Sequence, residues 1–186
     1  MNETLENIRS RRSVRNFQLE QINDFEIQSI IEASIFAPSA TNLQPWHFTV
    51  IQNKVILDRL SDTFKKLAKD SDNEYVKKFG NNENFHVFYH APTVVIVSGD
   101  ENSKSAPVDC AAAVENILIS AESLDVGSCW VGLIALVFNS EEGAAFIKEL
   151  EIPKGFKQIH AVALGYKKNM STIAPARKEN TVNYVR

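Results

Sequence analysis

Cysteine and long apolar runs are the features that this sequence most lacks. Only two of its 186 residues are cysteines, Cys110 and Cys129, and their spacing matches no zinc or redox motif. We therefore expect reduced thiols in a core. No apolar run approaches the roughly 18 residues of a membrane-spanning helix, and the N-terminus lacks the basic start and apolar centre of a secretory signal. These absences predict a soluble, cytoplasmic protein with no membrane partner.

Basic charge is also scarce. The chain has 20 lysines and arginines against 23 acidic residues, for a net charge of −3. A nucleic-acid-binding protein normally carries a basic excess or stripe, so no nucleic-acid partner is expected. The four histidines are scattered without metal-ligand spacing, and His160 is typical of a core residue in an apolar strand. No GxSxG, GxGxxG or P-loop motif occurs, so we expect neither a metal nor a catalytic side-chain nucleophile.

The remaining sequence has the pattern of one mixed domain over residues 1–186, with 44% hydrophobic residues and no repeat or linker. Hydrophobic periodicity predicts helices over residues 3–12, 24–37, 54–69, 107–124 and 140–150, and strands over 47–52, 91–98, 129–134 and 158–165. The polar residues 70–86 are expected to contain a mobile loop at 80–84, and residues 174–186 to be extended. Helices that alternate with buried strands predict an α+β layered domain.

The expected helix at residues 107–124 is the most apolar one. Apolar side chains cover more than half of its circumference, so it must be enclosed by a sheet, by another chain, or by both. Three consecutive alanines, residues 111–113, permit close approach of a second helix. We therefore expect an obligate homodimer.

Three arginines, Arg11, Arg12 and Arg15, fall within five residues, with Ser13 between them. In a helix Arg11 and Arg15 would share a face, whereas in an extended segment Arg11, Ser13 and Arg15 would share one side. Either geometry can direct two guanidinium groups at one oxyanion, such as a phosphate. The alternative is a solvated basic helix end. Arg177, near the C-terminus, offers a further phosphate partner.

A second polar segment runs from Pro38, which ends a predicted helix, to Trp46. Its side chains with hydrogen-bonding groups are Ser39, Thr41, Asn42 and Gln44. They suit the edges of an isoalloxazine or a similar heterocycle. An Asx-type turn would explain Ser39 and Asn42 without a ligand, but not the Gln44-Pro45-Trp46 sequence that follows.

A third segment, residues 127–133, places Gly132 in an expected apolar strand. Glycine there costs packing, and one common reason is close approach of the backbone to something flat. A β-bulge or a contact with a helix is an equally physical reason. This segment therefore supports a ligand site only in combination with the other two.

Together these segments resemble the FMN-dependent nitroreductase family. The matching stretches are residues 11–17, 38–48, 91–92, 127–132 and 160–166, and they occur in the family's order along nearly the whole chain. The resemblance implies an α+β homodimer whose subunits swap terminal segments and bind two FMN at their interface. It also implies a layered sheet-and-helix fold of the nitroreductase type.

The resemblance further implies roles for individual residues. Arg11 and Ser13 would reach the phosphate and the ribityl chain, and Arg15 would lie near the N1/C2-carbonyl side of the flavin. Pro38, Ser39, Ala40 and Asn42 would come from the other subunit, Val131 and Gly132 would present backbone to the N5 side, and Arg177 would return to the phosphate. Arg12, Gln44 and Leu133 complete the implied cofactor-binding set. Ala40 stands where a serine is common in this loop, which removes one donor, and residues 70–85 have no match in a region that usually shapes the substrate pocket.

The implied chemistry takes place on the cofactor. FMN accepts a hydride at N5 from NADH or NADPH and passes two electrons to a nitroaromatic, quinone or related acceptor, with Arg15 as a tuning charge and no catalytic side chain. A ping-pong mechanism is expected, because nicotinamide and acceptor would use one pocket. Two alternatives are a flavin-binding sensor or storage protein with little turnover, and a flavin enzyme of other chemistry, a dehydrogenase or dehalogenase.

Overall fold

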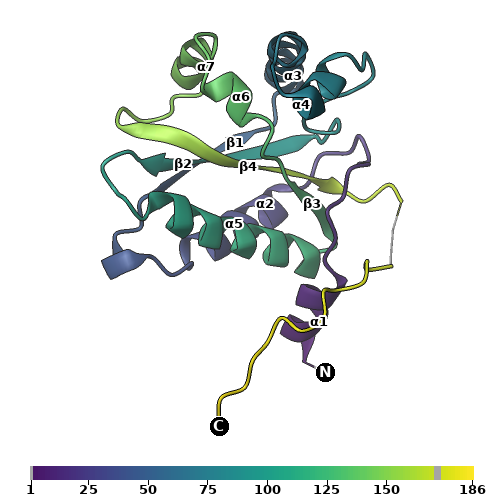
Figure 1. Ribbon diagram of the computed structural model, residues 1–186, viewed down its shortest axis with the longest axis vertical. Coiled ribbons are helices and arrows are strands. Elements are labelled where there is room, and N and C mark those ends of the chain that lie inside the picture. Colours follow the sequence, from purple (N-terminus) through teal and green to yellow (C-terminus); the bar gives the residue numbers. More distant parts are fainter. Residues whose placement is uncertain (1, 170–172) are drawn as a thin grey trace.

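The protein folds around one antiparallel sheet of four strands (Figure 1), in a computed structural model that describes residues 2–169 and 173–186. The strands are β1 (Trp46–Ile51), β2 (Thr93–Asp100), β3 (Val126–Trp130) and β4 (Phe156–Tyr166). Their order across the sheet is β1-β2-β4-β3, so the long β4 is inserted between strands that precede it in sequence. The register between β2 and β4 shifts between Val97 and Ser98.

Helices cover both faces of this sheet (Figure 1). On one face lie α2 (Asp24–Ile35) and α5 (Ala106–Ser123), and on the other lie α3 (Lys54–Lys69), α4 (Glu74–Gly80), α6 (Ala135–Phe138) and α7 (Gly143–Glu149). The short α1 (Glu3–Ser10) projects beside the end of α5, and a 3₁₀ turn (Ala40–Asn42) precedes β1. The two helix layers produce two separate apolar cores, one on each face of the sheet. The predicted α+β layered fold is confirmed.

Local sequence signals explain where several helices begin. Asn23 and Glu26 form a capping box at the start of α2, each side chain accepting a hydrogen bond from the other's backbone amide. The side chain of Asn53 accepts hydrogen bonds from two amides in the first turn of α3. The bounds of α3 agree with the prediction because its apolar stripe and its cap are both local.

The apolar helix α5 is enclosed largely by its own chain. It packs against the sheet and against α2, and eight of its residues, from Ala106 to Ala121, are buried. Val108, in contrast, is 72% exposed, and Ala111 and Ala112 are only half-buried. The sheet and α2 thus bury most of the apolar surface of α5. Only the outer face, which includes Val108, Ala111 and Ala112, remains for a partner to cover.

Several predicted bounds are wrong, and one helix is not predicted at all. The helix expected at 24–37 ends at Ile35. The first helix ends at Ser10 rather than at residue 12. The strand expected at 129–134 instead spans Val126–Trp130, so it contains Gly127 and not Gly132. The expected helix 140–150 begins at Gly143, because Ser140 turns its hydroxyl back onto Val137 instead of capping. The polar segment 70–86 contains the helix α4, whose final residue, Gly80, is buried against the backbone of α3.

Two cysteines and one histidine are expected in the core. Cys110 and Cys129 are free and buried, as expected, and burial raises the pKa of Cys110 to about 12. His160 is only half-buried, edge-on to Trp130. No helix within residues 2–169 and 173–186 is long and apolar enough to cross a membrane.

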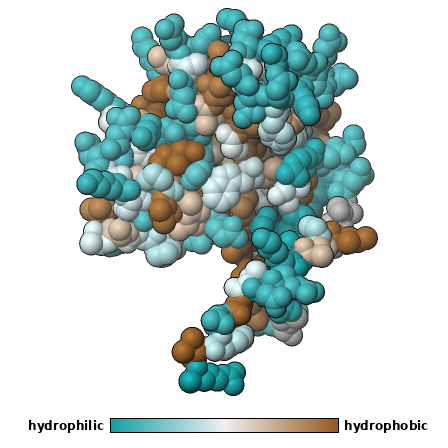
Figure 2. Space-filling view, in the orientation of Figure 1, coloured by the Kyte–Doolittle hydropathy of each residue, from teal (hydrophilic) through white to brown (hydrophobic). Residues whose placement is uncertain are grey.

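Two segments project from the compact body. They are α1 and the tail of residues 173–186, which runs past α1 without regular secondary structure (Figure 1). Apolar and polar side chains alternate along this projection (Figure 2). The large apolar residues exposed on it are Leu5, Ile8, Ile173, Val182, Tyr184 and Val185.

Gly99 lies where α5 packs closely against the sheet. A Cβ at this position would collide with Ile159 Cδ1 and would lie 3.0 Å from Ala106 Cβ and 3.2 Å from Cys110 Sγ. We therefore expect Gly99→Ala to lower the free energy of unfolding by about 1–3 kcal/mol, measured by urea denaturation.

Gly132→Ala is the matched control. No atom lies within 4 Å of a Cβ built at Gly132, so its unfolding free energy should change by no more than about 0.5 kcal/mol. Equal losses in the two variants would contradict the packing explanation.

Candidate functional site

The arginine segment is extended and joined to the sheet. Ser13 forms a parallel bridge with Ser128, and the Val14 amide donates to the Ser128 carbonyl oxygen at 2.8 Å. Of the two geometries that the sequence allows, the extended one is therefore correct from Arg11 onward. This pairing brings residues 11–15 beside β3 and so beside the segment 131–133 that follows this strand.

The guanidinium groups of this segment are incompletely paired. Arg11 Nε lies 3.9 Å from a carboxylate oxygen of Glu115, and Arg12 donates one hydrogen bond to the Arg11 carbonyl oxygen. Arg12 Nε is buried and has no hydrogen-bond partner. A buried donor without an acceptor costs free energy, so this segment suits an anionic group that supplies the missing acceptor.

Gly132 follows the end of β3 and faces open space. It is exposed, and a Cβ built on it would have no protein atom within 4 Å. The preceding Val131 is buried and its amide donates to the Ala161 carbonyl oxygen at 2.8 Å, while Leu133 packs against the core. Gly132 is therefore the residue of this segment whose backbone a flat ligand can reach.

The loop between Pro38 and Trp46 has a strained backbone. Thr41, Asn42 and Gln44 have φ angles of +50°, +58° and +48°, a region that residues other than glycine adopt at a cost. The Gln44 amide donates to Ser39 Oγ at 3.0 Å, and Gln44 Nε2 donates to Asn42 Oδ1 at 3.0 Å. Hydrogen bonds within the loop therefore maintain this shape, and its polar side chains remain exposed or half-buried.

Asp109, in the first turn of α5, joins this loop to the body. Its Oδ1 accepts a hydrogen bond from the Ala40 amide at 3.2 Å, and its Oδ2 is buried without a partner. A carboxylate at a helix N-terminus is stabilised by the helix dipole. This hydrogen bond ties the loop to the first turn of α5.

Within one chain, the two polar segments lie apart. Figure 1 shows the 3₁₀ turn (blue) at the N-terminal end of α5, whereas α1 and the arginine segment (purple) lie toward the other end. Arg177 lies in the exposed tail, outside the sheet and its helices. The structure thus joins residues 11–15 to β3, which residues 131–133 directly follow. Among the described residues, no hydrogen bond or ion pair joins this junction to Pro38–Gln44 or to Arg177.

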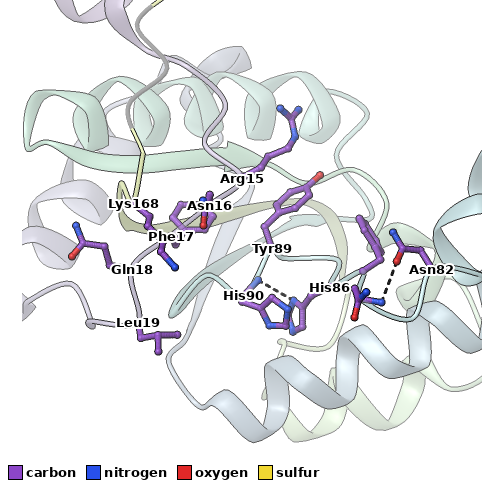
Figure 3. Close-up of a pocket in the computed structure, with 12 residues that line it drawn as sticks. Arg15, Asn16, Phe17, Gln18, Leu19, Asn82, His86, Tyr89, His90 and Lys168 are labelled. Carbon is purple, nitrogen blue, oxygen red and sulfur yellow. Dashed lines mark hydrogen bonds between the residues drawn. The ribbon is translucent and has the colours of Figure 1, made fainter.

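A cavity of about 770 Å³ opens beside Arg15. Residues 15–19 form one wall, and the turn between α4 and β2 forms another (Figure 3). The side chains from this turn are Asn82, Asn84, Phe85, His86, Tyr89 and His90. The sequence assigns no role to any of these residues. The family resemblance implies only that the region 70–85, which includes Asn82, Asn84 and Phe85, lies near a substrate pocket.

His86 is the most perturbed titratable group of this cavity. The residue is 7% exposed, and its ring lies against that of His90 at a tilt of 35°, with the centroids 4.3 Å apart. Burial is the main cause that lowers the pKa of His86 to about 4; His90 lowers it further, and the Asp58 carboxylate, 3.4 Å away, opposes the shift. The ring is therefore neutral at physiological pH.

This perturbation predicts a pH dependence of stability. The folded pKa of about 4 lies below the ordinary 6.5, so between these values the unfolded chain binds more protons. The free energy of unfolding should therefore fall as the pH is lowered from 6.5 to 4, by about 2–3 kcal/mol through His86.

The control for this prediction is His86→Asn, which does not titrate. The free energy of unfolding of the wild type minus that of the variant should decrease as the pH is lowered through this window, and it should level off below pH 4. Asp58, whose pKa is lowered from 3.8, contributes at lower pH. A difference independent of pH would contradict the assignment.

Comparison with known proteins identifies the relatives of this chain. The sequence profile of the Nitroreductase family matches residues 8–166. A protein of Archaeoglobus fulgidus, provisionally named NADH dehydrogenase/NAD(P)H nitroreductase, is 34% identical over 175 residues, which cover 91% of this chain and 88% of the relative.

Two crystal structures of nitroreductases with bound FMN have the same fold. One, from Bacteroides fragilis, is 36% identical with a TM-score of 0.93, and the other, from Desulfitobacterium hafniense, is 29% identical with a TM-score of 0.93. Each comparison covers 100% of both chains. The bound FMN agrees with the cofactor expected from the sequence, and the expected family is confirmed: this chain belongs to the Nitroreductase family of oxidoreductases.

Proposed function

We propose that this protein binds FMN and transfers electrons from NADH or NADPH to a small acceptor, a nitroaromatic, a quinone or a related compound. The observation that carries the proposal is the pairing of residues 11–15 with β3, just before the exposed Gly132. At this junction the guanidinium groups are incompletely paired, and Arg12 Nε is buried without an acceptor. FMN combines a phosphate with a flat polar ring, which are the two chemistries that this junction accommodates. The relatives with bound FMN support the same cofactor.

The residues have distinct proposed roles. Arg11, Arg12 and Ser13 bind the phosphate and the ribityl chain, because a cluster of guanidiniums pairs well with phosphate oxygens. Arg15 would bind the pyrimidine side of the ring, and the segment Val131–Leu133, with its exposed Gly132, would present backbone to the N5 side. When bound, FMN supplies the two-electron chemistry, so these residues need only bind, orient and tune it.

A second copy of the chain completes the proposed site. The loop residues Pro38, Ser39, Ala40, Asn42 and Gln44 lie apart from the arginine segment of their own chain. The loop is bound by Asp109 in the first turn of α5, whereas Arg11 lies beside Glu115, farther along this helix. In a homodimer they would line the partner's flavin, and Arg177 would reach a phosphate. The apolar side chains exposed on α1 and on the tail, such as Ile8 and Tyr184, support an exchange of terminal segments between subunits.

The first test concerns cofactor affinity. Arg11→Ala should weaken FMN binding by about 1.5–3 kcal/mol, the free energy of a charge-assisted contact. Titration of the apoprotein with FMN, followed by quenching of flavin fluorescence, measures the change.

Lys148→Ala is the control, because Lys148 is an exposed cation on α7, across the sheet. It should bind FMN like the wild type. The saturated wild type should have the mass of a dimer by light scattering. Unchanged affinity in Arg11→Ala would remove this residue from the site, and a flavin-loaded monomer would contradict the shared pocket.

The second test concerns electron transfer. Oxidised nicotinamide must leave before an acceptor can enter the same pocket, so double-reciprocal plots should give parallel lines. A fixed charge at Arg15 favours added negative charge on the flavin, so Arg15→Ala should lower the midpoint potential by about 30 mV, which is roughly 1.4 kcal/mol for two electrons. Reduction of the flavin in this variant by NAD(P)H, measured by stopped flow, should be slower than in the wild type.

Arg15→Lys keeps the charge and should retain most of the wild-type potential. Intersecting steady-state lines would reject the ping-pong scheme. An unchanged potential in Arg15→Ala would make Arg15 an ordinary surface charge.

A further inference from the structure

Tyr89 is the side chain that contacts Arg15. The Arg15 guanidinium carbon lies 5.7 Å from the centre of the Tyr89 ring (Figure 3). Hydrogen bonding with the Tyr89 side chain is the main cause that raises the pKa of Arg15. The Tyr89 ring is half-buried and meets Phe85 edge-on at 6.1 Å. An exposed arginine is thus placed against an anchored aromatic ring, a favourable cation–π geometry.

The backbone that presents this ring is strained. Tyr89 and His90 have φ angles of +56° and +57°, and two consecutive residues of this kind, neither of them glycine, cost about 1–3 kcal/mol each unless the surroundings impose the conformation. Such strain requires a specific support.

His86 provides that support. Its Nδ1 accepts hydrogen bonds from the Phe88 amide at 3.2 Å and from the His90 amide at 3.3 Å, and its carbonyl oxygen accepts the Tyr89 amide at 2.8 Å. Since Nδ1 is an acceptor, the neutral ring carries its proton on Nε2, which faces Asp58 at 3.4 Å.

The position of His86 is fixed in turn. The amide of the adjacent Val87 donates to Ser61 Oγ of α3 at 3.0 Å. His86 and His90 line both the cavity beside Arg15 and a second one of about 180 Å³. A chain of contacts therefore runs from α3 through His86 to Tyr89 and Arg15.

We propose that Tyr89 is a positioning residue, which holds the Arg15 guanidinium in the orientation that acts on the flavin, and that His86 holds Tyr89. The contact of Tyr89 with Arg15 does not depend on a cofactor, whereas its effect on the flavin rests on the proposed function. A free arginine side chain samples many rotamers, and an anchored ring reduces that number before any ligand binds.

The first experiment uses the protein without FMN. The Arg15 Nε–Hε resonance, assigned with Arg15→Lys, should be displaced by the ring of Tyr89. Tyr89→Leu should abolish this displacement, and Tyr89→Phe should retain most of it. A resonance that is the same in the wild type and in Tyr89→Leu would overturn the proposal.

The second experiment tests His86. In His86→Asn the amide oxygen can replace Nδ1 as acceptor for the Phe88 and His90 amides, so the Arg15 resonance should stay displaced. In His86→Leu that acceptor is absent and the displacement should be lost. If His86→Leu fails to fold, the link to His86 is decided by His86→Asn alone, and loss of the displacement there would overturn it.

The third experiment measures the flavin. In the FMN-loaded protein, Tyr89→Leu should shift the midpoint potential by at least half of the Arg15→Ala shift, and the double variant should match Arg15→Ala alone. A wild-type potential in Tyr89→Leu would overturn the positioning role. Failure of the wild type to bind FMN would instead overturn the proposed function and with it the flavin part of this proposal, leaving the contact to be decided by the first experiment.

Discussion

The backbone pairing of residues 13–18 with the sheet is the interaction on which the site depends. Val14 donates to Ser128 at the start of this stretch, and Gln18 donates to Tyr166 at its end, while Phe17 is buried between them. These bonds hold the chain that carries the arginines beside the sheet. The sheet in turn accommodates this stretch because Gly165 leaves room for Phe17: a Cβ there would lie 3.1 Å from the Phe17 ring.

The sequence was sufficient for features that depend on local signals. The bounds of α3 could be predicted because Asn53, an apolar stripe and terminal lysines all lie within the helix itself. The α+β class follows from the alternation of predicted helices and strands, and the family from motifs in a fixed order. The helix α4 was missed because its apolar residues, Val76 and Phe79, are too few to stand out from a polar segment.

Features that depend on tertiary contacts could not be predicted. The sequence places Gly132 in a strand, although β3 ends two residues earlier. No neighbouring atom would clash with a side chain at this position, so packing does not explain the glycine. No pattern in the sequence shows that the Pro38–Gln44 loop and the arginine segment lie toward opposite ends of α5. His86 and Tyr89 were missed for the same reason, since their significance comes from bonds within one turn and from Arg15, more than 70 residues earlier in the sequence.

The separation of the two polar segments has a thermodynamic consequence. In the proposed arrangement neither copy contains a whole flavin pocket, so cofactor binding and subunit association are linked equilibria. By reciprocity, any factor by which association tightens FMN is also the factor by which FMN tightens association. Dilution should then release flavin, and excess flavin should hold subunits together at concentrations where the apoprotein dissociates. The protein would thus respond to its own abundance as well as to that of its cofactor.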